Sequence, residues 1–263
     1  MKIGFIQTAP VFGEIKRNVD NASRRIALLD AELIVLPELF STGYRFKGRK
    51  EALGLAEDAG EGYASTVLLE AAKAKKTHIV AGFAERKGSR VYNSAMLIGP
   101  KGLIGVYRKA HLFWDEKKIF DPGDTPLRVH DIGKARVGMM ICFDWVFPEV
   151  CRTLALRGAD IIAQPSNLVL PYCPAAMITR SIENRVYSIT ANRVGTEERK
   201  TGKALRFIGS SQIAAPDGTV LAAASKTRPG AASVEIDVKR ARDKKITPMN
   251  DLFKDRRADL FDL

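Results

Sequence analysis

Residues 135–142, ARVGMMIC, form an apolar run that predicts a buried β-strand, and the following residues, FDWVFPE, predict the start of a helix. Cys142 at such a strand-to-helix elbow is well placed to be a nucleophile. Glu38 ends a second apolar run, LIVLPE, and Lys109 lies just past a third strand-like run, in VYRKAHLF. We expect the three side chains to meet at one rim of a sheet. There they would supply an attacking sulfur, a base and a positive charge.

The bulk composition is that of an ordinary globular protein. The chain has 263 residues, and we expect one domain over residues 1–263. Hydrophobic residues make up 46% and charged residues 27%. No apolar run is long enough to cross a bilayer, and the first residues lack the pattern of a signal peptide. The three cysteines have no disulfide or zinc-site spacing, so we expect reduced thiols and a cytoplasmic location.

The net charge of +12 at pH 7 has two interpretations. It fits a polyanionic partner such as nucleic acid, or a solvated basic surface with many ion pairs, as in proteins from hot environments. The basic residues are scattered along the chain, and no motif places a helix or an aromatic sheet on nucleic acid. We therefore favour the second interpretation and expect neither a nucleic-acid nor a membrane partner.

Strand-like runs alternate with amphipathic helical patterns along the chain. Helices are predicted over Glu14–Ala31, Ala64–Lys76, Pro148–Arg157 and Pro174–Arg185. Strands are predicted over Lys2–Thr8, Leu33–Pro37, His78–Glu85, Val91–Ile98, Leu103–Tyr107, Ala135–Cys142, Asp160–Gln164, Val186–Asn192 and most of Phe207–Val238. The pattern predicts a mixed α/β protein with both β-α-β and hairpin connections.

The cysteine needs activation, because only a thiolate attacks and a free thiol is mostly protonated near neutral pH. A nearby lysine and the positive end of a helix starting near Pro148 would favour the thiolate at Cys142. The backbone N–H of Phe143 could face the oxyanion formed by attack on a carbonyl or nitrile carbon. Cys151 and Cys173 lack this context, and we expect them to be buried structural residues.

Histidine and metal chemistry are not favoured by the sequence. A papain-like scheme needs a histidine beside the cysteine, and His111 is the one candidate. It lies two residues after Lys109, so we expect it to support the site or to pack in the core. The chain has no H-E-x-x-H motif and no Cys/His pairs at ligand spacing. We expect no metal and no cofactor.

Three blocks of sequence give the chain its resemblance to the nitrilase superfamily of carbon–nitrogen hydrolases. They are LPELFSTGY around Glu38, YRKAHLFWDEKKIFDPGD around Lys109 and GMMICFDWVFPE around Cys142, in the order and at the spacing of the family. Further similar stretches are YNSAMLIGPKG, GADIIAQPSNL and RSIENRVYSITANRVG. The similarity covers nearly the whole chain and is greatest to the short, single-domain nitrilases and amidases of thermophiles.

The resemblance implies a fold, a mechanism and an assembly. It implies a four-layer α-β-β-α sandwich in which Cys142 is the nucleophile, Glu38 the general base and Lys109 the stabiliser of the tetrahedral intermediate. Glu116 would be a second glutamate beside the cysteine that positions substrate or relays protons. The resemblance also implies a homodimer or a larger even-numbered homo-oligomer. The dimer would form through the helices after Cys142 and near Pro174–Arg185, with residues 251–263 reaching the partner.

Aromatic and polar residues near these segments are candidates for a small, mostly apolar substrate pocket. They are Tyr44, Phe113, Trp114, Phe143, Trp145 and Asn167. Core packing is the alternative role, most of all for Phe113 and Trp145. No arginine pair is dedicated to a substrate carboxylate, although Arg108, Arg180 or Arg193 could serve.

We therefore predict a hydrolase that converts small aliphatic nitriles or amides to an acid and ammonia through a cysteine thioester. One alternative is an amidohydrolase of N-carbamoyl amines or amino acids, which would release carbon dioxide as well as ammonia. An alternative of another class is a noncatalytic module that keeps the fold and binds a polyanion through its charge.

Overall fold

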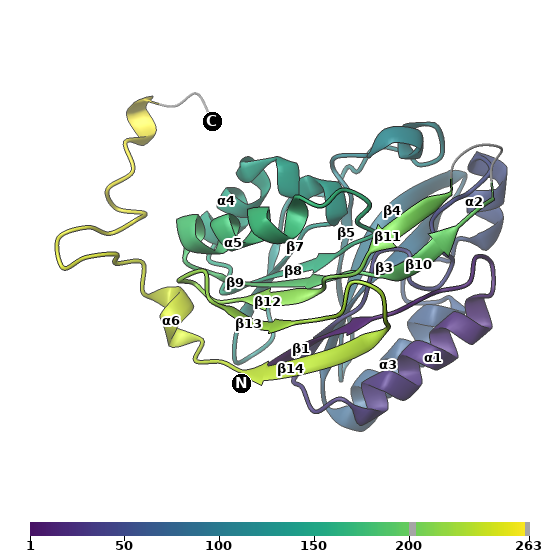
Figure 1. Cartoon of the computed structure of the whole chain (residues 1–263), viewed down its shortest axis with the longest axis horizontal. Coiled ribbons are helices and arrows are strands. Elements are labelled where there is room, and N and C mark those ends of the chain that lie inside the picture. The colour runs from purple at the N-terminus through teal and green to yellow at the C-terminus, as the bar shows by residue number, and fades with distance from the viewer. Residues whose placement is uncertain (200–203, 261–263) are drawn as a thin grey trace.

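Two six-stranded β-sheets stack face to face in the computed structural model, which describes residues 1–199 and 204–260 (Figure 1). The first sheet has the spatial order β14 (Gly230–Glu235), β1 (Lys2–Gln7), β2 (Leu33–Val35), β3 (His78–Lys87), β4 (Arg90–Gly99) and β5 (Gly102–Arg108). The second has the order β13 (Val220–Ala223), β12 (Gln212–Ala214), β9 (Tyr187–Ala191), β8 (Ile161–Pro165), β7 (Arg136–Met139) and β6 (Val129–Asp131). A separate hairpin consists of β10 (Val194–Glu197) and β11 (Leu205–Ile208).

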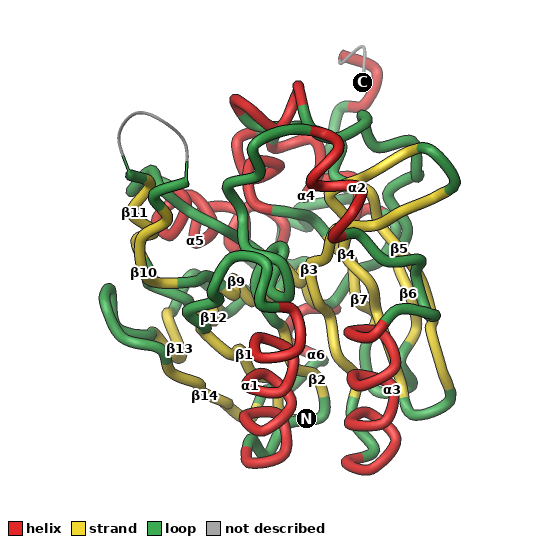
Figure 2. The backbone as a smooth tube through the Cα atoms, turned by 90° about the vertical axis from the view of Figure 1, so that its right-hand side faces the viewer, coloured by secondary structure: helices red, strands yellow, loops and turns green. Residues whose placement is uncertain are grey.

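Helices cover the outer face of each sheet. The first sheet carries α1 (Ile15–Leu28) and α3 (Tyr63–Lys75), which lie side by side (Figure 2). The second carries α4 (Pro148–Leu156) and α5 (Cys173–Asn184) on the opposite side of the molecule (Figure 1). Two shorter helices are α2 (Arg49–Leu55) and α6 (Lys239–Arg242). The expected four-layer α-β-β-α sandwich is confirmed. Within the described ranges, no helix is long and apolar enough to span a membrane.

The carboxyl ends of the central strands meet at one rim of the sandwich. β1, β2 and β3 are parallel to one another, as are β7, β8 and β9. Two antiparallel steps, from β3 to β4 and from β4 to β5, give β5 the direction of β3. A parallel bridge between Thr8 and Arg193 joins the ends of β1 and β9 across the two sheets. Residues that follow β2, β5 and β7 therefore share one edge of the molecule.

The continuous apolar run of β2 is explained by its burial on both faces. Leu33 and Val35 point into the core between the sheets, whereas Ile34 and Leu36 pack in the cluster beneath α1 and α3. The core between the sheets also contains Val137 of β7 and Ile161 of β8, so both sheets contribute to one apolar layer. The rim residues are thus held by strands that are anchored on all sides.

Some local predictions differ from the structure. The strand predicted over Ala135–Cys142 ends at Met139, and Cys142 instead begins a short 3₁₀ helix, η2 (Cys142–Val146). Helix α2 and the edge strand β6 were not predicted. α4 begins at Pro148, as predicted from the tolerance of proline in a first helical turn.

The C-terminal segment lies outside the sandwich. Residues 244–260 extend away from the sheets (Figure 1). The Phe253 ring lies near two cations, with its centroid 4.9 Å from Lys244 Nζ and 5.5 Å from Arg152 Cζ. Residues 261–263 of the tail that was expected to reach a partner lie outside the described residues.

Candidate active site

Glu38 lies three residues beyond the end of β2, in a loop that crosses close over β3. Gly82 of β3 permits this crossing, because a Cβ at Gly82 would lie 2.4 Å from the Glu38 Cα. Gly82 N–H donates to the Pro37 carbonyl at 3.1 Å, and Phe40 N–H donates to the Gly82 carbonyl at 3.0 Å. The loop is therefore fixed on both sides of Glu38, whose side chain is fully buried.

The two oxygens of Glu38 differ in their surroundings. Oε1 accepts hydrogen bonds from Asn93 Nδ2 and from Lys109 Nζ, both at 2.7 Å. Oε2 is buried and has no hydrogen-bond partner among the described residues. A carboxylate with one oxygen held and the other free is suited to accept a proton from a group beside it.

Lys109 follows β5 directly and places its ammonium between two carboxylates. Nζ lies 2.7 Å from Glu38 Oε1 and 2.8 Å from Glu116 Oε2, and the Lys109 side chain is fully buried. Burial would lower the pKa of Lys109, but the charges of Glu116 and Glu38 outweigh it and raise that pKa well above its ordinary value. The amine is therefore a permanent positive charge and not a base.

Glu116 lies in the 3₁₀ helix η1 (Trp114–Lys118) and completes the charged group. Its Oε1 accepts a hydrogen bond from the Tyr44 hydroxyl at 2.7 Å, and its Oε2 accepts one from Phe113 N–H at 3.1 Å. Burial raises the pKa of Glu116, the Lys109 charge opposes this, and the Glu38 charge adds to it. The ammonium, the tyrosine and the backbone together hold this carboxylate in one orientation.

Cys142 occupies a strained turn at the same rim. Its φ of +42° lies in the left-handed region that residues with a Cβ rarely adopt. Gln164 Nε2 donates a hydrogen bond of 3.0 Å to the Cys142 carbonyl and holds the turn. Burial raises the pKa of the Cys142 thiol well above its usual value; the charges of Glu38 and Glu116 add to this, and Lys109 opposes it. The thiol is therefore protonated at rest and needs a base.

Asp144 ties the cysteine turn to the lysine segment. Its Oδ2 accepts from Ile141 N–H at 2.8 Å and from the Tyr107 hydroxyl at 2.9 Å. Its Oδ1 lies 2.8 Å from His111 Nδ1, and the His111 ring stacks on Phe147 with centroids 3.6 Å apart. His111 thus supports a buried carboxylate and not the thiol itself, in line with the supporting role expected for it.

The predicted pocket residues divide between two small cavities. Phe113, Phe143, Trp145 and Asn167 line a cavity of about 20 Å³ together with Cys142. A second cavity, of about 10 Å³, is lined by Tyr44 and Trp114 together with Glu116. Trp114 is 57% exposed and does not line the Cys142 cavity. The structure therefore separates Trp114 and Tyr44 from Phe113, Phe143 and Trp145.

The three candidate arginines are all held by acidic residues. Arg108 pairs with Glu85 at 2.6 Å and with Asp124 at 2.7 Å, and Arg180 pairs with Glu183 at 3.1 Å. Arg193 forms a buried ion pair with Glu197. None of these arginines lines the cavity beside Cys142. Among the described residues, no arginine in the cavity lining is available for a substrate carboxylate.

Glu197 is a site residue that sequence reasoning missed. Its carboxylate accepts from the backbone N–H of Tyr44 at 3.1 Å and of Arg45 at 2.7 Å. These contacts, 152 and 153 positions apart in sequence, fix the loop that aims the Tyr44 hydroxyl at Glu116. Asn93, Gln164 and Asp144 were missed as well. Only the length of an apolar strand around a polar residue, as for Gln164 in β8, could have indicated them.

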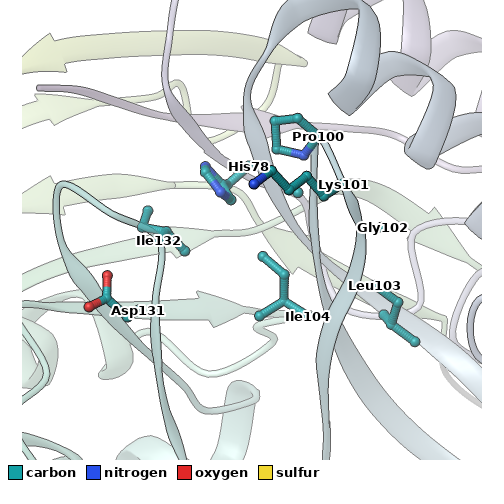
Figure 3. A pocket seen from close by; sticks show the side chains of 9 residues that line it. His78, Pro100, Lys101, Gly102, Leu103, Ile104, Asp131 and Ile132 are labelled. Atoms are coloured by element: carbon teal, nitrogen blue, oxygen red, sulfur yellow. The ribbon is translucent and has the colours of Figure 1, made fainter.

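A larger cavity lies at the other end of the strands. It has a volume of about 420 Å³ and is lined by residues that include His78, Lys101, Ile104 and Asp131 (Figure 3). His78 begins β3 and Asp131 ends β6, so this cavity is remote from the rim that carries Cys142. In the described part of the chain, no group of three or more His, Cys, Asp or Glu residues is arranged to hold a metal ion.

Comparison with known proteins agrees with this architecture. The Carbon-nitrogen hydrolase family model matches residues 2–246. The chain is 48% identical over 264 residues to a nitrilase from Pyrococcus abyssi (strain GE5 / Orsay), with 99% of each chain covered. A carbon-nitrogen hydrolase from Helicobacter pylori G27 superposes with a TM-score of 0.87 at 25% identity, over 99% of this chain and 96% of that one. An amidase from Nesterenkonia sp. superposes with a TM-score of 0.81 at 25% identity, over 99% and 94%.

The fold and the matched sequence define a hydrolase of the nitrilase superfamily. The chain belongs to the carbon–nitrogen hydrolase family. It is therefore an enzyme of the nitrilase and amidase type, and the noncatalytic polyanion-binding module considered from the charge is set aside.

Proposed function

We propose that the enzyme hydrolyses small amides or nitriles to a carboxylic acid and ammonia, with Cys142 as nucleophile. The observation that carries this proposal is the buried Lys109 ammonium, which lies 2.7 Å from Glu38 and 2.8 Å from Glu116. The charges of all three residues act on the pKa of the Cys142 thiol. A base with a free oxygen, a fixed cation and a strained sulfur together match the needs of covalent acyl transfer.

The reaction with an amide has two halves. In the first, Glu38 Oε2 takes the Cys142 proton while the sulfur bonds to the carbonyl carbon. Lys109 and the Phe143 N–H stabilise the oxyanion, because N–H groups in the first turn of a helix lack a partner within that helix. The carbon–nitrogen bond then breaks, Glu38 returns the proton to the departing ammonia, and a thioester remains.

In the second half, water replaces ammonia. Glu38 removes a proton from water as the oxygen attacks the thioester carbon. The carbon–sulfur bond breaks, the proton returns to the Cys142 sulfur, and the acid leaves. A nitrile would first form a thioimidate, which one water converts to the same thioester with loss of ammonia. Glu116, held by Tyr44 and Lys109, positions the ammonium and the substrate.

Small, uncharged acyl groups suit the cavity best. Its lining beside Cys142 is mainly aromatic and aliphatic, and Arg108, Arg180 and Arg193 are engaged by acidic partners. An N-carbamoyl amino acid would bring a carboxylate, and no arginine among the described lining residues is present to receive it. N-carbamoyl amines remain the alternative, and carbon dioxide released together with ammonia distinguishes them.

The test is ammonia release from a panel of short nitriles, amides and carbamoyl compounds. Wild type should release ammonia from at least one class, whereas Cys142→Ala should release none above background. Cys151→Ala is the matched control, because Cys151 lies on α4 and is fully buried. Turnover by Cys142→Ala at the wild-type rate would refute the mechanism.

We further propose that residues 1–263 act as one domain and assemble as a homodimer in the cytoplasm. Support for one domain is the apolar core shared by both sheets, and for the cytoplasm the three free cysteines. Support for dimerisation comes from exposed apolar side chains on α4 and α5, Leu156 at 43% and Ile182 at 46%. Sedimentation equilibrium should give a dimer, and Ile182→Glu should weaken it.

A further inference from the structure

The Asn167 side chain is buried without a hydrogen-bond partner. Asn167 is 3% exposed, and neither its carboxamide nitrogen nor its oxygen bonds to any described residue. The next backbone N–H, of Leu168, is satisfied by Asn192 Oδ1 at 2.9 Å. Leaving one buried polar group unpaired costs about 1–3 kcal/mol. A folded protein that keeps both atoms of an amide in this state is expected to gain a partner during function.

Asn167 lines the cavity that contains the Cys142 sulfur. The other lining residues are aromatic or aliphatic, namely Phe113, Phe143, Trp145, Leu168, Val169 and Leu170. The backbone N–H of Asn167 donates toward the Cys142 sulfur and lowers the thiol pKa against the stronger effect of burial. The cavity of about 20 Å³ has room for one water molecule, which would serve the amide until substrate displaces it.

We propose that the Asn167 carboxamide binds an uncharged polar group on the acyl part of the substrate. The substrate class is then a short amide or nitrile that carries a hydroxyl or a second amide, in preference to a plain hydrocarbon chain. Asn167 and Cys142 line the same small cavity, so the carboxamide would meet the part of the acyl chain nearest the reacting carbon. A carboxylate is disfavoured there, because no arginine lines the cavity.

This inference rests on the proposed function and is tested by matched amides. kcat/KM is measured for propionamide, 2-hydroxypropionamide and 3-hydroxypropionamide. Wild type should prefer one hydroxylated amide to propionamide by at least about tenfold, because a site built to bond a hydroxyl leaves polar groups unpaired with the analogue that lacks it. Asn167→Leu, of similar shape, should abolish the preference and lower kcat/KM for the hydroxylated amide only.

Two further variants complete the experiment. Asn167→Ala should lose the same preference without filling the cavity, which covers the case in which leucine is not accommodated. Asn21→Leu, an exposed asparagine on α1, should leave the ratio unchanged. A wild-type preference for propionamide, or a hydroxyl preference that survives in both Asn167 variants, would overturn the inference. Absence of any Cys142-dependent hydrolysis would instead overturn the proposed function.

Discussion

Gln164 Nε2 donates a hydrogen bond of 3.0 Å to the backbone carbonyl of Cys142. Gln164 is fully buried in β8, and its Oε1 accepts from Thr190 Oγ1 at 2.8 Å. The glutamine thus links two strands of the second sheet to Cys142, whose backbone is left-handed. Such a conformation costs roughly 1–3 kcal/mol and persists only where its surroundings impose it.

Gln164→Met should therefore release the Cys142 turn. Loss of the bond also leaves the Cys142 carbonyl and the Thr190 hydroxyl unpaired, so we expect destabilisation of about 1–3 kcal/mol. We expect kcat to fall by about 100-fold, since a displacement of about 1 Å at a reacting atom has effects of this size. Thr190→Val, which removes only the outer bond, is the control and should lose less in both urea unfolding and kcat.

Glu38→Gln should separate thiol reactivity from turnover. The Glu38 charge raises the pKa of the Cys142 thiol, so its removal lowers that pKa and increases the thiolate fraction at a given pH. Alkylation by iodoacetamide at pH 8 should become faster, while amide hydrolysis falls by about 10²–10⁴-fold without the base. A parallel fall of both rates would contradict this assignment.

Cys151 and Cys173 are internal controls for the alkylation experiment. Burial raises the pKa of each of these thiols to about 12. Neither should react in the folded protein below pH 9, and both should react after unfolding in urea. Peptide mass spectrometry assigns the modified residue.

Lys109→Met should destabilise the fold in a pH-dependent manner. It leaves Glu38 and Glu116 as two buried carboxylates without their cation, which costs about 3–5 kcal/mol near pH 8. Burial already raises the pKa of Glu116, and loss of the ammonium raises that pKa further. The folded variant then binds a proton that the unfolded chain has released, so its stability falls as pH rises above the ordinary glutamate pKa.

Urea unfolding of this variant and of wild type at pH 5 and pH 8 measures the effect. The deficit of Lys109→Met should be larger at pH 8 than at pH 5. Lys101→Met, at an exposed lysine in the turn between β4 and β5, should show no such dependence. An equal loss of stability at both pH values would show that Lys109→Met does not leave an unpaired, charged carboxylate in the interior.

Glu197→Gln should reduce turnover through Tyr44. The substitution weakens the bonds that hold the backbone of Tyr44 and Arg45, and we expect kcat to fall about tenfold because the tyrosine hydroxyl no longer stays on Glu116. In a Tyr44→Phe background the same substitution should have little further effect on kcat. The matched control is Glu198→Gln, at an exposed neighbour.

Gly82→Ala should displace Glu38. The added methyl group would lie 2.4 Å from the Glu38 Cα and 2.9 Å from the Pro37 carbonyl oxygen, so the loop must move. We expect a loss of kcat of about 100-fold or more with the secondary structure retained by circular dichroism. Gly54→Ala in α2, where nothing lies within 4 Å of the new carbon, should leave activity intact.

The sequence predicts the parts of this protein that depend on local patterns. Runs such as LIVLP and RVGMM contain apolar residues that are buried on both faces, and their polar flanks place Glu38 and Cys142 near strand ends. The blocks around Glu38, Lys109 and Cys142 also indicate the family. The four-layer arrangement follows from that resemblance, because periodicity alone does not say how two sheets pair.

The remaining features depend on contacts between distant residues. β7 ends at Met139, and the Ile141 N–H donates to the Asp144 carboxylate instead of to a neighbouring strand. An apolar run in the sequence does not reveal this hydrogen bond. Trp114 is an aromatic residue of the kind that lines pockets, but it begins the 3₁₀ helix η1 with a φ of +46°, and its side chain is exposed. Glu197 acts on a loop about 150 residues away, so no spacing rule could assign it.

Glu38 and Lys109 follow strands of the first sheet, whereas Cys142 follows a strand of the second. The catalytic groups therefore come from both sheets, and neither sheet carries all of them. A small separation of the two sheets, without unfolding of either sheet, would therefore abolish turnover. On heating, activity should therefore fall at a temperature some degrees below that at which the circular-dichroism signal changes. The difference between the two temperatures would report how tightly the two sheets are packed.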